Sequence, residues 1–229
     1  MQVDSVLMIH GAGGGGWEWS SWSRVFAAAG WRVSAPDLMP AAAGLADTSL
    51  RDYEAQVRDW MRAVQPRLVI GASLGGLLAL RCHAAAAGAA LVLVNPMPPA
   101  GFAPASPPAR IYPDIVPWRS TASLASTART LPDANPSSWH DAWRRWRDES
   151  GRVLNEAATG PGIQHPAAPV LMIVSAADRD VTPSTSRALA TALSADVLEL
   201  PGASHVGPLL GRSAPIVAAR VLNWGALRN

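Results

Sequence analysis

The 229-residue chain contains no lysine, so all nineteen of its basic side chains are arginines. Without a lysine the protein cannot form a Schiff base, anchor pyridoxal phosphate or use the lysine of a P-loop. Its one cysteine, Cys82, excludes an internal disulfide. Composition alone therefore rules out Schiff-base catalysis, P-loop nucleotide hydrolysis and a disulfide-stabilised scaffold.

The sequence also lacks long apolar runs and blocks of like charge. Its longest apolar stretch, residues 84–94, is too short to cross a bilayer. No basic leader precedes the first apolar run, and the formal net charge is only +2. We therefore expect a cytoplasmic monomer or homodimer that binds neither nucleic acid nor a membrane.

Six short apolar runs along the chain predict strands. They are nearly continuous in aliphatic residues, which is typical of strands buried on both faces of a parallel sheet. Segments with helical spacing lie between them, and this alternation predicts a doubly wound α/β fold with a mostly parallel sheet of about six strands. The expected strands are residues 5–10, 31–36, 67–71, 90–95, 169–175 and 196–201. The expected helices are residues 48–65, 74–87, 184–193 and 214–225.

Residues 96–168 break the alternation of strands and helices. They begin with a proline-rich stretch, and further on Trp139, Trp143 and Trp146 recur at the spacing of one helix face. We therefore expect a helical cap insertion at 96–168 on an α/β core of residues 1–95 and 169–229. The opposite face of the expected helix carries Arg144, Arg145 and Arg147 and is expected to be solvated.

The third expected strand leads directly into Gly71-Ala72-Ser73-Leu74-Gly75, which has the pattern G-x-S-x-G. Between a strand and a helix this pattern is typical of a nucleophile elbow, a sharp turn that exposes a serine hydroxyl above the sheet. The two glycines stand where a side chain would approach the neighbouring backbone too closely. Ser73 is therefore the predicted nucleophile.

A serine nucleophile needs a base and an acid beside it. His205 follows the last expected strand and Asp178 follows the fifth, so both lie at carboxyl ends of strands, where sites in open α/β sheets collect. The chain order Ser73, Asp178, His205 is the order that accompanies a nucleophile elbow. Asp180, in the same loop as Asp178, is the alternative acid.

These motifs resemble those of the α/β-hydrolase superfamily over nearly the whole chain. The matching segments are HGAGGGGWEW, APDL, GASLGG, SAADRDVTP and GASH. Within the superfamily the chain is similar to small cap-bearing esterases, including the plant methyl esterase and hydroxynitrile lyase group. The resemblance implies an α/β-hydrolase fold, and it makes the backbone N–H groups of Ala12 and Leu74 the oxyanion hole. No cofactor is expected, and because the sequence has no H-x-x-x-H or C-x-x-C pattern, no metal is expected either. It also favours Asp178, which stands five residues before Pro183, as the acid.

A second interpretation of the N-terminal glycines has to be weighed. Gly11, Gly13 and Gly16 form a G-x-G-x-x-G pattern, and Asp37 lies where a dinucleotide site would place an acid for the ribose. However, Trp17 follows the third glycine at once, where a dinucleotide fold needs close packing of its helix. The resemblance instead makes this segment an oxyanion loop, in which glycines let the backbone approach the substrate.

The sequence therefore predicts a serine hydrolase that cleaves a carboxylic ester, thioester or lactone of a small, largely apolar substrate through an acyl-enzyme. Trp17, Trp139 and Trp143 are expected to frame the substrate pocket. Two alternatives stay open. A cofactor-free oxygenase, a carbon–carbon bond hydrolase or a lyase would use the same scaffold, and a receptor-like protein would bind a ligand without turnover. Hydroxynitrile lyases of this group carry a lysine beside the histidine, whereas Val206 stands there in this chain.

Overall fold

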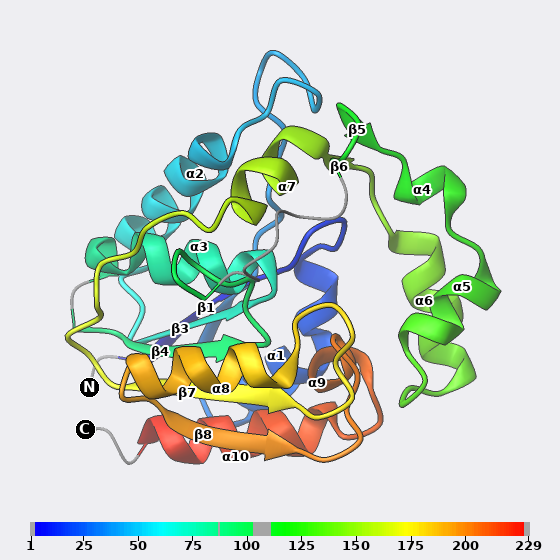
Figure 1. Ribbon diagram of the computed structural model, residues 1–229. Coiled ribbons are helices and arrows are strands. Elements are labelled where there is room, and N and C mark those ends of the chain that lie inside the picture. Colours follow the sequence, from blue (N-terminus) through cyan, green and yellow to red (C-terminus); the bar gives the residue numbers. More distant parts are fainter. Residues whose placement is uncertain (1–2, 87, 103–110, 227–229) are drawn as a thin grey trace.

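The computed structural model describes residues 3–86, 88–102 and 111–226 (Figure 1). Its centre is a six-stranded sheet with the order β2-β1-β3-β4-β7-β8, in which every pairing is parallel. The predicted doubly wound parallel sheet is confirmed, and all six predicted strands are present. They are β1 (Ser5–Ile9), β2 (Arg32–Ser34), β3 (Leu68–Ala72), β4 (Ala90–Val94), β7 (Val170–Ser175) and β8 (Asp196–Leu200).

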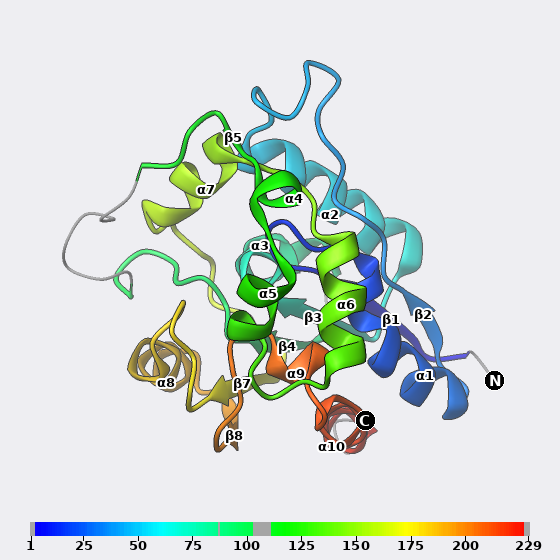
Figure 2. The same ribbon diagram turned by 90° about the vertical axis from the view of Figure 1, so that its right-hand side faces the viewer.

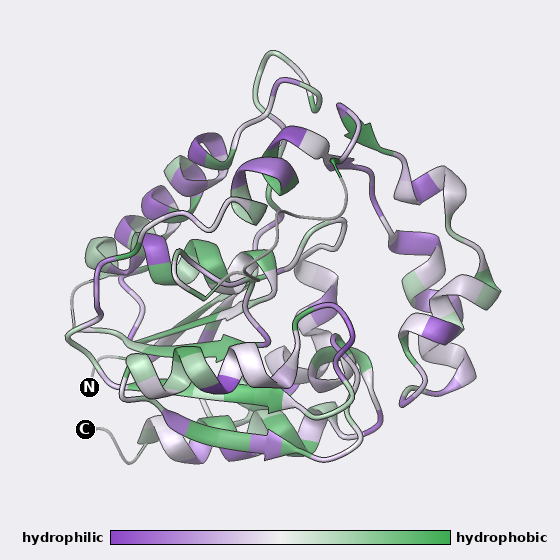
Figure 3. Cartoon of the chain, viewed as in Figure 1, coloured by the Kyte–Doolittle hydropathy of each residue, from purple (hydrophilic) through white to green (hydrophobic). Residues whose placement is uncertain are grey.

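Helices cover both faces of this sheet. Because successive strand side chains point to opposite faces, Val6 and Met8 of β1 belong to one apolar layer, and Leu7 and Ile9 to the other. The first layer is closed by α1 (Ser20–Ala28) and α10 (Ala214–Ala226). The second is closed by α2 (Leu50–Val64), α3 (Leu74–Cys82) and α8 (Pro183–Ala192). Figure 3 shows the result, with apolar strands between helices whose outer faces are polar.

Local signals explain where the predicted helices begin. Ser49 accepts a hydrogen bond from the N–H of Asp52, and the carboxylate of Asp52 accepts one from the N–H of Ser49. This capping box satisfies two N–H groups that a helix start leaves free, and it begins α2. Helix α1 was not predicted, because its sequence SSWSRVFAA opens with residues of weak helix propensity. No described helix is long and apolar enough to cross a membrane.

Between β4 and β7 the chain leaves the sheet, and residues 96–168 are called the insertion below. Helices α4, α5 and α6 stand beyond the carboxyl ends of the strands (Figures 1 and 2). Helix α6 ends at Arg145, so Trp146 lies just past the helix on which it was predicted. The elements of the insertion are β5 (Ile115–Val116), α4 (Trp118–Thr121), α5 (Leu124–Thr130), α6 (Pro136–Arg145), β6 (Glu149–Ser150) and α7 (Gly151–Ala158). The proline-rich residues 103–110 lie outside the described residues.

Candidate active site

Ser73 lies in the turn between β3 and α3 with φ 52° and ψ −119°. Residues other than glycine rarely adopt such a conformation, and it costs on the order of 1–3 kcal/mol. A side chain on Gly71 would collide with the backbone of Gly75, and one on Gly75 would collide with the carbonyl groups of Ile9 and His10. The sharp turn therefore depends on both glycines of the motif, and it raises Ser73 at the carboxyl end of β3.

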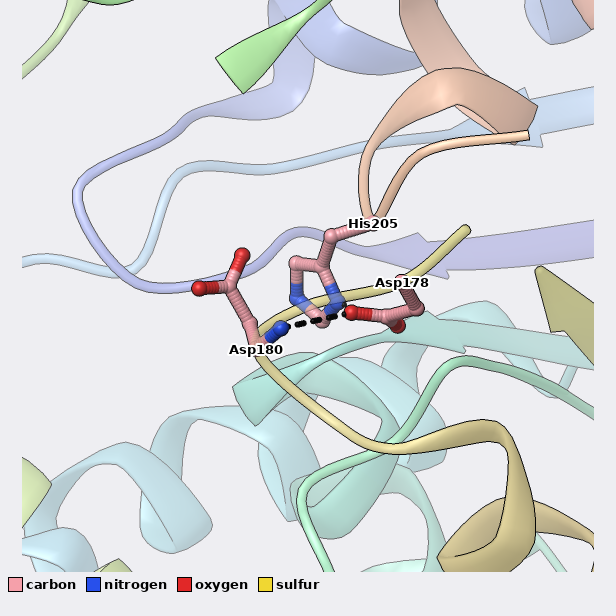
Figure 4. Close-up of side chains that lie close together, drawn as sticks. All are labelled: Asp178, Asp180 and His205. Atoms are coloured by element: carbon pink, nitrogen blue, oxygen red, sulfur yellow. Dashed lines mark hydrogen bonds and ion pairs between the residues drawn. The ribbon is translucent and has the colours of Figure 1, made fainter. Parts of the chain in front are cut away.

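His205 and Asp178 face each other at the same end of the sheet (Figure 4). Nδ1 of His205 lies 2.7 Å from Oδ2 of Asp178, whose side chain is only 1% exposed. Oδ1 of Asp178 accepts hydrogen bonds from the N–H groups of Asp180 and Val181. With both oxygens held, the carboxylate fixes the imidazole so that Nε2 points away from Asp178 and stays free to exchange a proton.

The protonation of His205 is set by opposing effects. Burial alone would lower the pKa of His205. The hydrogen bond and charge of Asp178, together with the charge of Asp180, outweigh this and raise the pKa above the usual value of 6.5. An imidazolium formed during a reaction is therefore stabilised by the neighbouring carboxylates.

Asp180, the alternative acid, occupies a different environment from Asp178. It is exposed, and it forms no hydrogen bond with His205 among the described residues. Single ligand atoms of Asp178, Asp180 and His205 lie within 4.8 Å of one another, which is close enough for a metal ion. Both oxygens of Asp178 already accept hydrogen bonds. The geometry suits Asp178 as the partner of the histidine, with Asp180 contributing charge.

One buried side chain, which the sequence analysis missed, holds this end of the sheet together. Asn95, at the end of β4, donates from Nδ2 to Oγ of Ser175 (2.8 Å) and to the carbonyl oxygen of His205 (2.7 Å). Its Oδ1 accepts from the N–H of Ser175. The preceding residue, Val94, accepts a hydrogen bond from the N–H of Ser73. The strand end at residues 94 and 95 thus anchors both the serine turn and the histidine loop.

The two atoms that would exchange a proton are available. Within the part of the chain that the structure describes, neither Oγ of Ser73 nor Nε2 of His205 forms a hydrogen bond. In enzymes without substrate such catalytic contacts are often long and shorten when substrate binds. The absence of these hydrogen bonds is therefore compatible with a serine nucleophile and a histidine base in the absence of substrate.

The loop after β1 passes beside the serine, as an oxyanion loop must. A Cβ on Gly11 would lie 3.3 Å from Cβ of Ser73. The N–H groups of Ala12 and Leu74 form no hydrogen bond with any described residue. Free N–H groups near a nucleophile can bind the negative oxygen that develops when it attacks a carbonyl.

The glycine pattern of this loop serves protein contacts rather than a dinucleotide. Gly13 has φ 65°, and a Cβ there would collide with the ring of Trp118. Gly16 donates its N–H to Asp37 at 2.7 Å, and the second oxygen of Asp37 lies 3.5 Å from Arg147. Asp37 therefore supports the loop by accepting from the N–H of Gly16, and the ring of Trp118 lies against Gly13.

The predicted pocket tryptophans do not all lie together. A small apolar cluster, called the insertion cluster, contains Trp17, Trp139 and Trp146 but not Trp143. Trp143 is 38% exposed and donates from Nε1 to the carbonyl oxygen of Ala122. Trp146 instead contacts Trp17 edge to face, with ring centroids 5.4 Å apart. The full insertion cluster is Leu131, Ala134, Ala142, Trp17, Trp139, Trp146, Val206 and Leu210.

Two further histidines and the cysteine have structural roles. His10 is fully buried, its Nε2 accepts from the N–H of Leu38, and burial lowers its pKa to about 4, so it stays neutral and supports the loop. His83 lies 2.7 Å from the carbonyl oxygen of Ala89. Burial raises the pKa of Cys82 to about 12, which keeps its thiol protonated and unreactive.

Glu18 is a buried carboxyl beside the site that the sequence did not reveal. It is 2% exposed, and Oε2 accepts from the N–H of Gly15 at 3.3 Å, while a side chain on Gly14 would collide with the carboxyl group. Burial raises the pKa of Glu18 to about 8, against smaller opposing effects that include the Gly15 hydrogen bond and the positive charges of His205 and Arg147. Near neutral pH the carboxyl group is therefore largely protonated.

We expect Glu18→Gln to change how stability depends on pH. The pKa of this carboxyl is about 8 in the folded protein against 4.5 normally, so only the folded state holds the proton between these values. The contribution of this carboxyl group to the free energy of unfolding falls as pH rises from 4.5 to about 8, by at most about 1.4 kcal/mol per pH unit. Urea unfolding at pH 5, 6.5 and 8 should show wild type losing stability relative to the variant. Parallel curves for the two proteins would contradict the assignment.

Comparison with known proteins shows which family and which solved structures the chain is similar to. The sequence model of the alpha/beta hydrolase family matches residues 6–219. Tomato methylketone synthase I complexed with 2-tridecanone superposes with a TM-score of 0.76 at 14% identity, over 100% of both chains. An Arabidopsis methylesterase gives 0.71 at 16%, over 98% of this chain and 100% of the other. The thioesterase domain from the curacin biosynthetic pathway gives 0.71 at 18%, over 96% and 92%.

These likenesses to solved structures establish the fold, and no curated protein matches the chain. The family model runs from β1 into α10 and includes the turn of Ser73 and the loops of Asp178 and His205. The chain therefore belongs to the alpha/beta hydrolase family.

Proposed function

We propose that the protein is a serine hydrolase that cleaves a carboxylic ester, thioester or lactone of a small, largely apolar substrate. The observation that carries this proposal is the placement of Ser73, in a strained turn after β3, and of the hydrogen-bonded pair of His205 and Asp178, after β8 and β7, at the carboxyl ends of strands in one parallel sheet. Membership of the alpha/beta hydrolase family supports hydrolysis as the reaction class.

The proposed reaction proceeds in two acyl-transfer steps. Oγ of Ser73 attacks the carbonyl carbon while Nε2 of His205 accepts the hydroxyl proton. The negative oxygen is bound by the N–H groups of Ala12 and Leu74, each contributing about a hundredfold to a thousandfold in rate. His205 returns the proton to the leaving alcohol or thiol, and the same residues then activate a water molecule that releases the acid. Asp178 keeps the imidazole in the required tautomer throughout.

Apolar residues next to His205 and Ser73 support an apolar substrate. Val206, next to His205, belongs to the insertion cluster with Trp17 and Trp139. Met97 donates its N–H to the carbonyl oxygen of Ser73 and packs against the core. Apolar groups thus flank both the base and the nucleophile. The fold itself does not choose between esters and thioesters, because one scaffold supports many reactions.

Turnover and active-site labelling test this proposal together. We expect the purified protein to hydrolyse p-nitrophenyl esters of two to eight carbons, and to be inactivated by one equivalent of a fluorophosphonate. Mass spectrometry should place the label on the peptide that carries Ser73. Labelling of a different residue would overturn the nucleophile assignment. Labelling of Ser73 without turnover of any ester or thioester would overturn hydrolysis and favour a receptor or a non-hydrolytic reaction.

A further inference from the structure

The glycine loop beside Ser73 is held in place by a segment of the insertion more than 130 residues away. Oε2 of Glu149 accepts a hydrogen bond from the N–H of Gly13 at 2.9 Å. The backbone N–H of Arg147 donates to the carbonyl oxygen of Gly13 at 2.8 Å, and Nε of Arg147 donates to that of Gly14 at 2.7 Å. Three of the four backbone polar groups of Gly13 and Gly14 therefore bind Arg147 or Glu149. This arrangement also corrects the expectation that Arg147 lies on a solvated face.

Glu149 is itself rigidly anchored in the protein. It is 3% exposed, and Oε1 accepts hydrogen bonds from the hydroxyl of Tyr53 on α2 and from the N–H of Ser150, both at 2.8 Å. Burial and the nearby Glu149 carboxylate raise the pKa of Tyr53, so its hydroxyl remains a donor. A buried carboxylate with three hydrogen bonds holds its partners firmly, because bonds to a charged acceptor are stronger than neutral ones.

The loop needs such an external support. Residues 13–16 are four consecutive glycines, which have more conformational freedom than any other sequence. The one hydrogen bond that Gly13 and Gly14 make within the loop, from the N–H of Gly14 to the carbonyl oxygen of Gly11, is long at 3.4 Å. The N–H of Gly13 belongs to the peptide that directly follows Ala12. Its bond to Glu149 therefore fixes the backbone next to the N–H that would bind the oxyanion.

We propose that Glu149 is a positioning residue for the oxyanion hole, and that it acts by holding Gly13 so that the N–H of Ala12 points at the reacting carbonyl oxygen. Arg147 assists by fixing the carbonyl groups of Gly13 and Gly14. The insertion then takes part in catalysis in addition to covering the strand ends. This inference rests on the proposed serine-hydrolase function.

Glu149→Gln is the variant that separates this role from a general structural one. One carboxylate oxygen of Glu149 accepts from Gly13, and the other accepts from Tyr53 and Ser150. Glutamine has only one side-chain oxygen, so it cannot accept hydrogen bonds on both sides. We expect kcat for a p-nitrophenyl ester to fall about tenfold to a hundredfold with KM changed less than threefold, because the oxyanion contact strengthens only in the transition state. A trifluoromethyl ketone, which adds to Ser73 and forms an oxyanion, should bind more weakly by a similar factor. Binding of the product acid should not change.

Glu156→Gln is the matched control. Glu156 also lies in the insertion, and its Oε2 accepts a hydrogen bond from the backbone N–H of Leu50 at 2.8 Å, away from the glycine loop. This variant should keep kcat and ketone affinity within about twofold of wild type. If Glu149→Gln does not fold, Arg147→Met should lower kcat in the same selective manner. This variant keeps the backbone bond to Gly13 and loses the side-chain bonds to Gly14 and Leu38 and the ion pair with Asp37.

The outcomes distinguish this inference from the function on which it rests. If wild type hydrolyses esters but Glu149→Gln keeps the wild-type kcat and ketone affinity, the positioning role is wrong while the hydrolase proposal stands. If both Glu149→Gln and Glu156→Gln lower kcat and weaken product binding, the two substitutions loosen the insertion in general. That result also overturns the positioning role of Glu149. If wild type itself has no hydrolase activity and no affinity for the ketone, the function has failed.

Discussion

Replacing Ser73 by alanine is expected to lower kcat/KM for p-nitrophenyl butyrate by at least about a thousandfold. The variant loses the nucleophile but keeps the oxyanion donors and the substrate contacts, which alone leave only a small residual rate. Hydrolysis by wild type and Ser73→Ala, measured side by side at saturating and limiting substrate, gives the comparison. Retention of more than a tenth of the wild-type rate would show that another group performs the attack.

Ser73→Gly provides a matched control for this result. At φ 52° and ψ −119° serine and alanine are both strained, whereas glycine is not. Ser73→Gly should therefore be inactive like Ser73→Ala, yet more stable than it by about 1 kcal/mol or more in urea unfolding. An active Ser73→Gly protein would exclude the hydroxyl as the nucleophile. Equal stability of the two variants would show that the turn carries no strain.

The sheet and the serine turn were predictable because their signals are local. The four central strands, β1, β3, β4 and β7, are short apolar runs buried along their whole length, whereas the edge strands β2 and β8 are partly exposed. The order of such runs along the chain determines the alternation of strands and helices. The glycines two residues before and two residues after Ser73 leave room for the backbone to approach closely in the turn, which allows its strained conformation. Both signals lie within a few residues of the feature that they specify, so a single sequence contains them.

The contacts that support the site were not predictable, because they join distant parts of the chain. Glu149 binds the backbone of Gly13, and Asn95 binds the carbonyl group of His205 more than 100 residues away. Neither contact leaves a spacing or motif, since the partner is a backbone group of unspecified residue type. The high pKa of Glu18 was not predictable either, because it comes from burial by the surrounding fold. An acid between two tryptophans in WEW was the one local sign of it.

The helix that carries the tryptophans of the insertion ends earlier than predicted. Trp139, Trp143 and Trp146 share one face only if the helix includes all three, but α6 ends at Arg145. Beyond that point the chain turns, and Trp146 reaches Trp17. Trp143 lies on α6 like Trp139, yet it is exposed and does not belong to the insertion cluster. Helix ends depend on capping and tertiary contacts, which periodicity does not encode.

The second large effect is expected from replacing Asp178, the proposed acid of the triad. Asp178→Asn is expected to lower kcat by a factor on the order of a thousand to ten thousand. The side-chain oxygen of asparagine would stay with the N–H groups of Asp180 and Val181, which now hold Oδ1. Its NH₂ group would then face Nδ1 of His205, and the imidazole would have to carry its proton on Nε2. In that tautomer it cannot accept the proton of Ser73.

Asp180→Asn is the control, since it changes a carboxylate of the same loop that makes no hydrogen bond to His205 among the described residues. It should keep kcat within about threefold of wild type. Because the charge of Asp180 helps to raise the pKa of His205, its loss should move the rise of kcat/KM with pH to lower pH, with the plateau unchanged. The measurement is kcat/KM from pH 5 to 9 for wild type and both variants. A large loss in Asp180→Asn with an active Asp178→Asn would assign the acid to Asp180, and equal small losses would mean that neither carboxylate orients the base.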